Sequence, residues 1–277
     1  MSEHYTAKHI DDLWVPGKSL DEHFPAATPE QISNELSRIH DSVTTTGDIL
    51  GSIRVPSMYE EVKAVASIDL CEIVRYTART LASFAGRLDF DRNVYLAGLW
   101  EDERFSDIRH IDMTIQPIVQ VAMNHGHVPP VDGIELIADH MKQWRKEGVY
   151  CVANTSTASG CELATMRFMQ EYLPDCFDGI IFPRNPDGFG KTTKADALSR
   201  VIEILNTNGH TPDFALHVDD TVHHIISMLE QEPHPDMHLF VPAYPDNIAV
   251  SGLAKNVLRS PTPVASFVAM DDYIKSK

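Results

Sequence analysis

The sequence predicts an α/β fold in which a parallel sheet is flanked by helices. From about residue 134 to residue 245, short apolar segments of strand length alternate with amphipathic segments of helix length. Strands that crossover helices bury on both faces read as continuous apolar runs, so this alternation indicates a parallel sheet. A chain of 277 residues with 43% hydrophobic residues is long enough to bury a sizeable core, as one large domain or one domain with an appendage.

Residues 1–60 are expected to form an N-terminal extension with one helix. Thr28, Pro29 and Gln31 have the residue types of an N-cap, a first helical position and a capping-box partner. Apolar residues then recur at helical spacing from Ile32 onward, and the helix is predicted to end near residues 44–47. No function can be assigned to this helix beyond packing against the main domain.

The main domain is expected to be interrupted once. Residues 62–68 form a mostly apolar run that ends at Asp69, which is typical of a buried parallel strand, and a helix is predicted over residues 73–84. Residues 86–128 are irregular and too long for a simple connection, so they are predicted to form a small, mainly helical insertion. The main domain is therefore assigned residues 61–85 and 129–277.

Helices and strands alternate regularly in the second part of this domain. Helices are predicted over residues 134–144, 163–172, 197–205 and 222–229. Strands are predicted over residues 149–153, 177–182, 214–218 and 237–241. Asn154, Asp219 and Asp220 come directly after two of these strands, at the edge where open α/β sheets bind their ligands.

The composition excludes several classes of function. With 23 Lys and Arg against 40 Asp and Glu, the formal charge is −17, which disfavours a nucleic-acid partner because binding to its phosphates needs clustered cations. The sequence contains no run of 18 apolar residues, which a membrane span would need. The polar N-terminus has no signal-peptide pattern. The four cysteines include no CxxC pair and are typical of reduced thiols, so we expect a cytoplasmic protein.

Four groups of polar residues at strand ends or in nearby loops are expected to meet at one edge of the sheet. They are Asp69; Asn154, Thr155 and Ser156; Lys191 or Lys194; and the pair Asp219 and Asp220. Two adjacent carboxylates repel each other, and Mg²⁺ suits such a site because it takes oxygen ligands and leaves room for phosphate and water. The alternative, an Asp N-cap for the next helix, explains one aspartate of the pair better than the second.

This set of residues is suited to phosphoryl transfer through an aspartyl-phosphate. Asp69 is the candidate nucleophile, because carboxylates form such intermediates. Mg²⁺ bound by Asp69, Asp219 and Asp220 would offset the repulsion between the nucleophile and a small phosphorylated substrate.

The remaining groups are expected to bind the phosphate. Thr155 or Ser156 would donate hydrogen bonds to its oxygens, and the choice between Asn154 and Thr155 as the phosphate ligand depends on a strand boundary of one residue. A lysine would add positive charge. The spacing to the following helix favours Lys191, whereas Lys194 falls in the first helical turn and is compatible with a solvated side chain.

The order of Asp69, Thr155 or Ser156, a lysine, and Asp219 with Asp220 resembles the haloacid dehalogenase (HAD) superfamily of phosphohydrolases. The resemblance covers roughly residues 62–245 and its strongest part is residues 134–221. It implies a Rossmann-like core, a small cap at residues 86–128, a Mg²⁺ cofactor and hydrolysis of a small phosphate ester. The short cap and residues 240–245 resemble the 5′-nucleotidase branch, which would make the substrate a nucleotide.

The sequence departs from the family pattern at Cys71. Phosphatases of the family have a second aspartate at this position, which protonates the leaving oxygen and then activates water. A thiol has a reference pKa of about 8.5, and losing general acid–base help typically costs about 10²–10⁴-fold. Glu72 is adjacent, but in an extended segment its side chain would point to the opposite face. Two alternatives remain: a non-catalytic HAD-fold binding or regulatory protein, and a HAD enzyme that acts on carbon–phosphorus or carbon–halogen bonds.

Two other segments have motif-like spacing. Asp89 and Asp91 form a second Asp-x-Asp candidate, but no apolar strand precedes them, so Asp69 is preferred as the nucleophile. Residues 188–193 resemble a phosphate-binding loop, but Asn185 stands where a Walker A motif needs glycine.

The histidines do not predict a zinc site. No third ligand is suitably spaced from either pair, so these residues are interpreted as surface or cap side chains: His125, His127, His223 and His224. His217 lies inside the strand before Asp219 and is predicted to be a buried, hydrogen-bonded imidazole.

Overall fold

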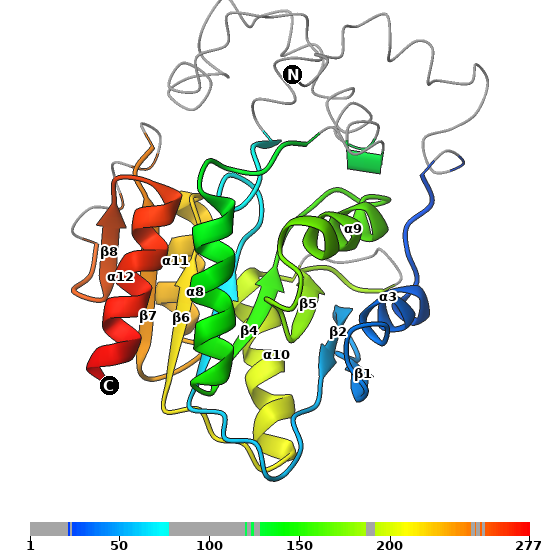
Figure 1. The fold of residues 1–277 in the computed structure, drawn as a ribbon, viewed down its shortest axis with the longest axis horizontal. Helices are drawn as coiled ribbons and strands as arrows, with labels where there is room; N and C mark the ends of the chain where they lie inside the picture. Colours follow the sequence, from blue (N-terminus) through cyan, green and yellow to red (C-terminus); the bar gives the residue numbers. More distant parts are fainter. Residues whose placement is uncertain are drawn as a thin grey trace, which may run out of the picture.

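The computed structural model describes residue 22, residues 24–77, residues 120, 123 and 124, residues 128–186, residues 192–244, residues 247 and 250, and residues 253–277. Within these ranges the chain forms one eight-stranded sheet with helices on both faces (Figure 1). The α/β fold predicted from the sequence is confirmed. Nearly all of the predicted cap at residues 86–128 lies outside the described residues.

The sheet has the strand order β1-β2-β5-β4-β3-β6-β7-β8. Its strands are β1 (Val43–Thr45), β2 (Leu50–Arg54), β3 (Ala64–Ile68), β4 (Val149–Asn154), β5 (Gly179–Phe182), β6 (Phe214–Val218), β7 (Met237–Pro242) and β8 (Val257–Ser260). From β5 to β8 all neighbours are parallel, and β1 and β2 add an antiparallel edge. The central strands are buried along their whole length, which explains their continuous apolar runs.

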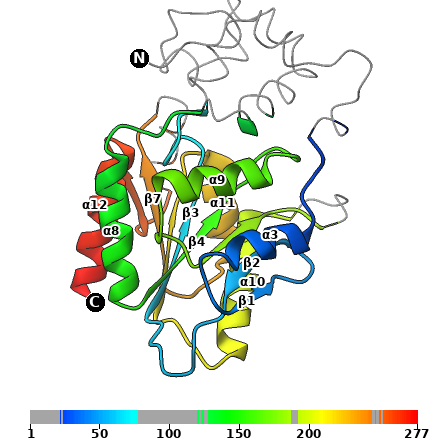
Figure 2. The same ribbon diagram turned by 45° about the vertical axis from the view of Figure 1, so that its right-hand side comes forward.

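Helices cover both faces of this sheet. They are α3 (Pro29–Leu36), α8 (Ile134–Lys146), α9 (Glu162–Tyr172), α10 (Lys194–Thr207), α11 (Val222–Gln231) and α12 (Pro263–Ser276). One hydrophobic core joins the sheet to α3, α8, α9 and α12, and a second joins it to α10 and α11 (Figures 1 and 2). Each face therefore has its own core, and the sheet separates them.

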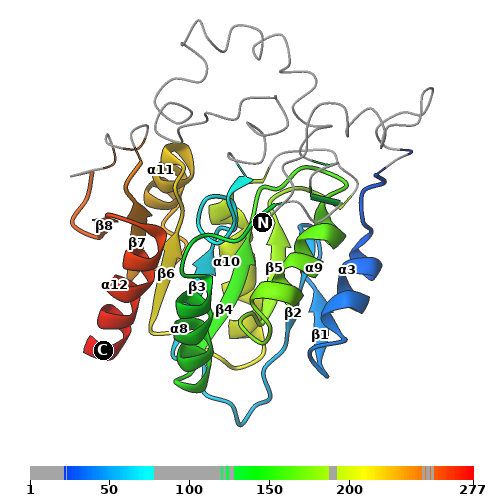
Figure 3. The same ribbon diagram turned by 45° about the horizontal axis from the view of Figure 1, so that its top comes forward.

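The strand order reverses beside β3. From β3 the chain continues through β4 and β5 on one side, and it then returns to place β6, β7 and β8 on the other side (Figure 3). In open α/β sheets, ligands bind at such a reversal, outside the carboxyl ends of the strands. The topology alone thus directs attention to the ends of β3 and β6.

The N-terminal extension differs from the prediction in two respects. The capping box of Thr28 and Gln31 is present, but the helix ends at Leu36 rather than near residues 44–47. The residues after it form β1 and β2, which continue the main sheet. A Cβ on Gly51 would lie 2.6 Å from the carbonyl oxygen of Ile180, so glycine permits β2 to pack closely against β5.

Other differences lie at the two ends of the main domain. The helix predicted to start at residue 73 is not present over residues 73–76, where the chain makes a turn closed by a bridge between Cys71 and Arg75. The strand β8 and the helix α12 were not predicted. Across the described ranges, no helix is both long and apolar enough to cross a membrane.

Candidate active site

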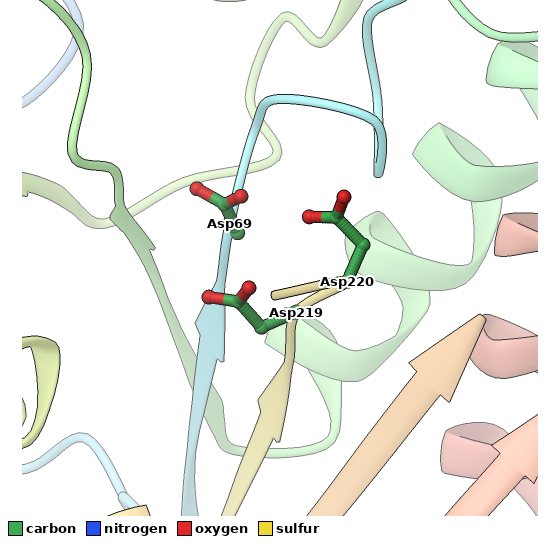
Figure 4. A group of neighbouring side chains, drawn as sticks. All are labelled: Asp69, Asp219 and Asp220. Carbon is green, nitrogen blue, oxygen red and sulfur yellow. The ribbon is translucent and has the colours of Figure 1, made fainter. Parts of the chain in front are cut away.

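Asp69 and the pair Asp219 and Asp220 lie at the carboxyl ends of neighbouring parallel strands. Asp69 follows β3 and Asp219 follows β6, and the last residues of these strands, Ile68 and Val218, are paired. The Asp69 N–H donates to the Val218 carbonyl at 3.0 Å, so the ladder continues one residue past the strands. The topology therefore brings acids about 150 positions apart in the chain to one place (Figure 4).

The three carboxylates form a candidate metal centre. One oxygen from each of Asp69, Asp219 and Asp220 lies within 4.8 Å of the other two. Their side chains gather at the ends of β3 and β6 (Figure 4), and the residues are only 4%, 0% and 7% exposed. Carboxylate oxygens are the ligands that Mg²⁺ takes in proteins, with further positions left for water and phosphate. The donor set therefore fits Mg²⁺.

Lys194 supplies the positive charge beside these acids. Strand alternation directs Asp69 and Asp219 to the face of the sheet that α10 covers, and Lys194 is the first residue of α10. Its Nζ lies 2.8 Å from Asp69 Oδ1 and 2.5 Å from Asp219 Oδ2. Burial opposes the charged ammonium, but the two carboxylates outweigh this effect and raise the pKa of Lys194 above its usual value.

This arrangement corrects the interpretation of the lysines. Lys194 is 1% exposed, so the solvated side chain that its sequence position allowed is wrong. The helix begins at Lys194 itself, with Thr193 as the N-cap, and this start directs the side chain inward. Lys191, which spacing favoured, lies outside the described residues.

The pKa values of the two adjacent aspartates are shifted in opposite directions. Burial alone would raise the pKa of Asp219, but the charge of Lys194 and two neighbouring imidazoles hold that pKa well below its usual range. Burial raises the pKa of Asp220 well above its usual range, and the charges of Asp219 and Asp69 add to this effect. The cluster thus has more negative charge than Lys194 can balance, and a divalent cation fits that imbalance.

A polar network on the α10 face supports the acids. Asn154 Nδ2 donates to Ser67 Oγ at 3.1 Å and to the Lys194 carbonyl at 2.9 Å. His217 Nδ1 lies 3.0 Å from Ser67 Oγ, and its Nε2 lies 3.4 Å from Asp219 Oδ2. The prediction of a buried, hydrogen-bonded His217 is confirmed, and burial lowers the pKa of its imidazole. Through its amide nitrogen, Asn154 fixes the start of α10.

Thr155 and Ser156 follow β4, next to β3 in the sheet. Thr155 is fully buried, and its hydroxyl has no hydrogen-bond partner among the residues that the structure describes. A buried hydroxyl without a partner costs free energy, so this group is suited to bind a ligand oxygen. Ser156 is exposed.

Cys71 contacts a cation that the sequence did not indicate. Arg75 is fully buried, and its Nη2 donates to Cys71 Sγ at 3.5 Å and to Thr157 Oγ1 at 3.2 Å. Its Nη1 donates to Thr165 Oγ1 at 3.1 Å. The predicted helix over residues 73–84 gave no reason to expect a buried guanidinium here.

His224 is a second residue that sequence reasoning placed differently. It lies near the start of α11, and its Nδ1 is 3.1 Å from Asp219 Oδ2, so the interpretation as a surface or cap histidine is wrong for this residue. Five positions separate it from Asp219, and the N-terminal turn of the helix folds back onto the strand end. The neighbouring His223 is exposed, as expected.

Several predicted features lie outside the described residues. These are the alternative nucleophile Asp89 and Asp91, the histidines His125 and His127, and the glycine-rich segment at residues 188–191. Within the described ranges, the three aspartates are the only group of ligating side chains with the spacing of a metal site.

No protein-family model matches the chain, and no curated protein matches it. Solved structures with a similar fold include CbbY from Rhodobacter sphaeroides in complex with phosphate, with 15% identity over 73% of this chain and 95% of that chain, and a TM-score of 0.46. A HAD family hydrolase from Deinococcus radiodurans, with bound phosphate and sodium, has 14% identity over 76% and 96% and a TM-score of 0.45. A haloacid dehalogenase-like hydrolase from Xanthomonas campestris has 11% identity over 80% and 97% and a TM-score of 0.43.

Proposed function

We propose that this chain is a Mg²⁺-dependent phosphohydrolase of the HAD type, which hydrolyses a small phosphate ester through an aspartyl-phosphate. The observation that carries the proposal is the buried cluster of Asp69, Asp219, Asp220 and Lys194 at the strand-order reversal. Burying four ionisable side chains is costly, and three acids beside one lysine leave an excess of acidic groups. In phosphoryl transfer, each of these four side chains has a function.

Asp69 is the nucleophile in this proposal. One of its carboxylate oxygens bonds to phosphorus while the ester P–O bond breaks, and water then breaks the acyl-phosphate bond and releases inorganic phosphate. Asp69, Asp219 and Asp220 would hold Mg²⁺, which supplies positive charge against the phosphate oxygens. Lys194 adds a fixed positive charge beside the nucleophile, and the Thr155 hydroxyl donates to a phosphate oxygen.

A second candidate function uses the same site without turnover. The sulfur of Cys71 accepts a hydrogen bond from Arg75 at 3.5 Å, and a thiol thus stands where phosphatases of the HAD superfamily have their proton donor. This contact favours a protein that binds phosphorylated ligands and releases them unchanged. The two candidates differ in whether inorganic phosphate is formed.

The test is a substrate panel with Mg²⁺, applied to the wild type, Asp69→Asn and the matched control Asp139→Asn. Asp139 is exposed on α8, so its replacement should leave activity unchanged. The panel contains nucleoside monophosphates, a sugar phosphate, p-nitrophenyl phosphate, a phosphonate and a 2-haloacid. We expect phosphate release by the wild type and the control, and none by Asp69→Asn.

The other outcomes separate the alternatives. Equal activity of Asp69→Asn and wild type would remove Asp69 from the mechanism. Calorimetric binding of a phosphate ester without phosphate release, in the wild type and in Cys71→Asp alike, would favour the binding protein. Turnover of the phosphonate or the haloacid alone would identify a different reaction at the same cluster.

A further inference from the structure

Two loops of the candidate site leave neighbouring strands and lose their backbone contact with each other. The strands β3 and β4 are parallel and lie side by side (Figure 3). At their ends, the Asp69 N–H donates to Val218 of β6 at 3.0 Å, and the Thr155 N–H donates to Ile181 of β5 at 3.1 Å. Among the described residues, no backbone hydrogen bond joins residues 70–77 to residues 155–161. Side chains must therefore set the distance between these two loops.

The side chain of Arg75 connects the two loops. Its own N–H donates to the Leu70 carbonyl at 3.1 Å, which anchors it to the loop after β3. Its Nη2 donates within that loop to Cys71 Sγ at 3.5 Å, and across to Thr157 Oγ1 at 3.2 Å in the loop after β4. Its Nη1 donates to Thr165 Oγ1 of α9 at 3.1 Å. One guanidinium group thus joins both loops and a helix.

The positive charge of Arg75 has no carboxylate partner among the described residues. The side chain is fully buried, its acceptors are two hydroxyls and a sulfur, and its Nε has no hydrogen-bond partner in the described part of the chain. The ring of Phe168, 5.8 Å from the guanidinium carbon, offsets only part of the cost. A buried cation without a paired acid is costly, so core packing alone does not explain an arginine here. A rigid fork of donors that reaches several acceptors does.

Thr157 is held from its other side as well. Arg184, just after β5, donates from Nη1 to the Thr157 carbonyl at 2.9 Å. Thr157 lies two residues after Thr155, whose buried hydroxyl is the candidate phosphate ligand. Fixing Thr157 therefore restricts where the Thr155 hydroxyl lies.

We propose that Arg75 is a positioning residue of this site, which holds the loop that carries Thr155 against the loop that carries Asp69. The inference rests on the proposed phosphohydrolase function, in which one phosphate contacts both of these side chains. Small misplacements of groups that act on the same substrate are costly, so the separation of the two loops affects the rate.

The test uses the matched pair Thr157→Val and Thr165→Val. Each variant removes one hydroxyl that accepts from Arg75, but only Thr157 belongs to the loop of Thr155. We expect kcat/KM for p-nitrophenyl phosphate to fall about tenfold in Thr157→Val and to stay at the wild-type value in Thr165→Val. Calorimetry with inorganic phosphate and Mg²⁺ should show weaker binding in Thr157→Val alone, although both variants lose stability in chemical denaturation.

Double variants separate positioning from a general loss of stability. If Thr157 acts through Thr155, adding Thr157→Val to Thr155→Val should lower kcat/KM little further, whereas the two losses of stability should add. If the Thr157 hydroxyl acts through the guanidinium, adding Thr157→Val to Arg75→Met should likewise change kcat/KM little. Additive losses of kcat/KM in either pair would overturn the proposal, and so would equal kcat/KM values for Thr157→Val and Thr165→Val.

Failure of the proposed function would give a different result. Phosphate binding that weakens in Thr157→Val, without ester turnover in any variant, would overturn hydrolysis and retain the role of Arg75 in holding Thr155. Turnover that disappears in Asp69→Asn but is unchanged in Thr157→Val would overturn the role of Arg75 and retain hydrolysis. A wild type that neither binds phosphate nor hydrolyses esters would overturn both.

Discussion

Two buried charge clusters lie at opposite edges of the sheet, and they differ in their balance of charge. At the amino edge, Asp178 is 1% exposed and accepts from Arg54 Nε at 2.8 Å and from Arg145 Nη2 at 2.7 Å. Arg54 also donates to Glu60 at 2.7 Å, so two guanidinium groups meet two carboxylates. At the carboxyl edge, three carboxylates lie beside one lysine, Lys194, and two imidazoles.

The amino-edge cluster is complete as it stands. Its carboxylate also accepts from the Cys151 N–H at 3.0 Å, and the Tyr150 hydroxyl donates to the Arg54 carbonyl at 2.7 Å. A cavity of about 770 Å³ lies beside it, a volume within the range of ligand sites. Its buried charges are nevertheless already paired. Buried charge alone therefore does not distinguish the candidate site. What distinguishes it is an excess of negative charge that a bound cation would balance.

The largest expected effect comes from breaking the complete cluster. Asp178→Ala leaves Arg54 and Arg145 partly buried without their shared carboxylate, and removal of one partner of a buried ion pair costs about 3–5 kcal/mol. Chemical denaturation should show this loss, and Mg²⁺ should not restore it. Asp213→Ala, at an exposed position, is the control and should stay within about 0.5 kcal/mol of the wild type. A loss of that small size for Asp178→Ala would contradict the structural role.

At the carboxyl edge, we expect Mg²⁺ to compensate for the loss of the Lys194 ammonium group. Lys194→Met leaves the carboxylates of Asp69 and Asp219 without their ammonium partner, and we expect a loss of about 3 kcal/mol at neutral pH without metal. Mg²⁺ at about 100 times its Kd contributes about 2.7 kcal/mol to any protein that binds it only when folded. Denaturation with EDTA and with Mg²⁺ should therefore show most of the loss restored. No restoration would mean that the three acids do not form a metal site.

The regular part of the fold could be predicted from the sequence because the patterns that indicate its helices and strands are local. The strands β4, β6 and β7 and the helices α8 to α11 lie within a few residues of their predicted ranges, since each has its own apolar periodicity. The strands β1, β2 and β8 have three to five residues each and lie at or near the sheet edges. Gly51 and Ser52 interrupt the pattern of β2, and only its pairing with β5 reveals the strand.

The candidate site also has one part that the sequence predicts and another part that it does not. The meeting of Asp69 with Asp219 and Asp220 follows from parallel strands alone, because their carboxyl ends share one edge. The choice between Lys191 and Lys194 depends on where a helix begins, to within three residues, and sequence patterns do not fix that boundary. Glu72 itself has a left-handed backbone, with φ +60°, so strand alternation cannot predict the direction of its side chain.

A smaller and opposite effect is expected from Asp220→Asn. Burial and the charges of Asp219 and Asp69 raise the folded-state pKa of Asp220, so its contribution to stability is fully present below its unfolded pKa and is lost as pH rises through the folded one. At alkaline pH the metal-free variant should be more stable than the wild type by on the order of 1–2 kcal/mol. The difference should vanish at acidic pH, and Mg²⁺ should stabilise the variant less. A variant less stable at alkaline pH would contradict the proposed repulsion.

The smallest expected effect comes from two matching capping boxes. Thr193 caps α10 by accepting from the Asp196 N–H at 2.9 Å, and Thr28 caps α3 by accepting from the Gln31 N–H at 3.2 Å. Replacement of either threonine by alanine should cost about 1 kcal/mol in denaturation.

Only one of these helices carries a residue of the candidate site. Lys194 directly follows Thr193, so a frayed first turn displaces the ammonium from Asp69 and Asp219. We therefore expect kcat of Thr193→Ala to fall on the order of tenfold, since small misplacements of catalytic groups are costly, while Thr28→Ala keeps the wild-type kcat. Equal kcat values for the two variants would show that the ammonium is held by the carboxylates alone, and that the start of α10 does not determine where it lies.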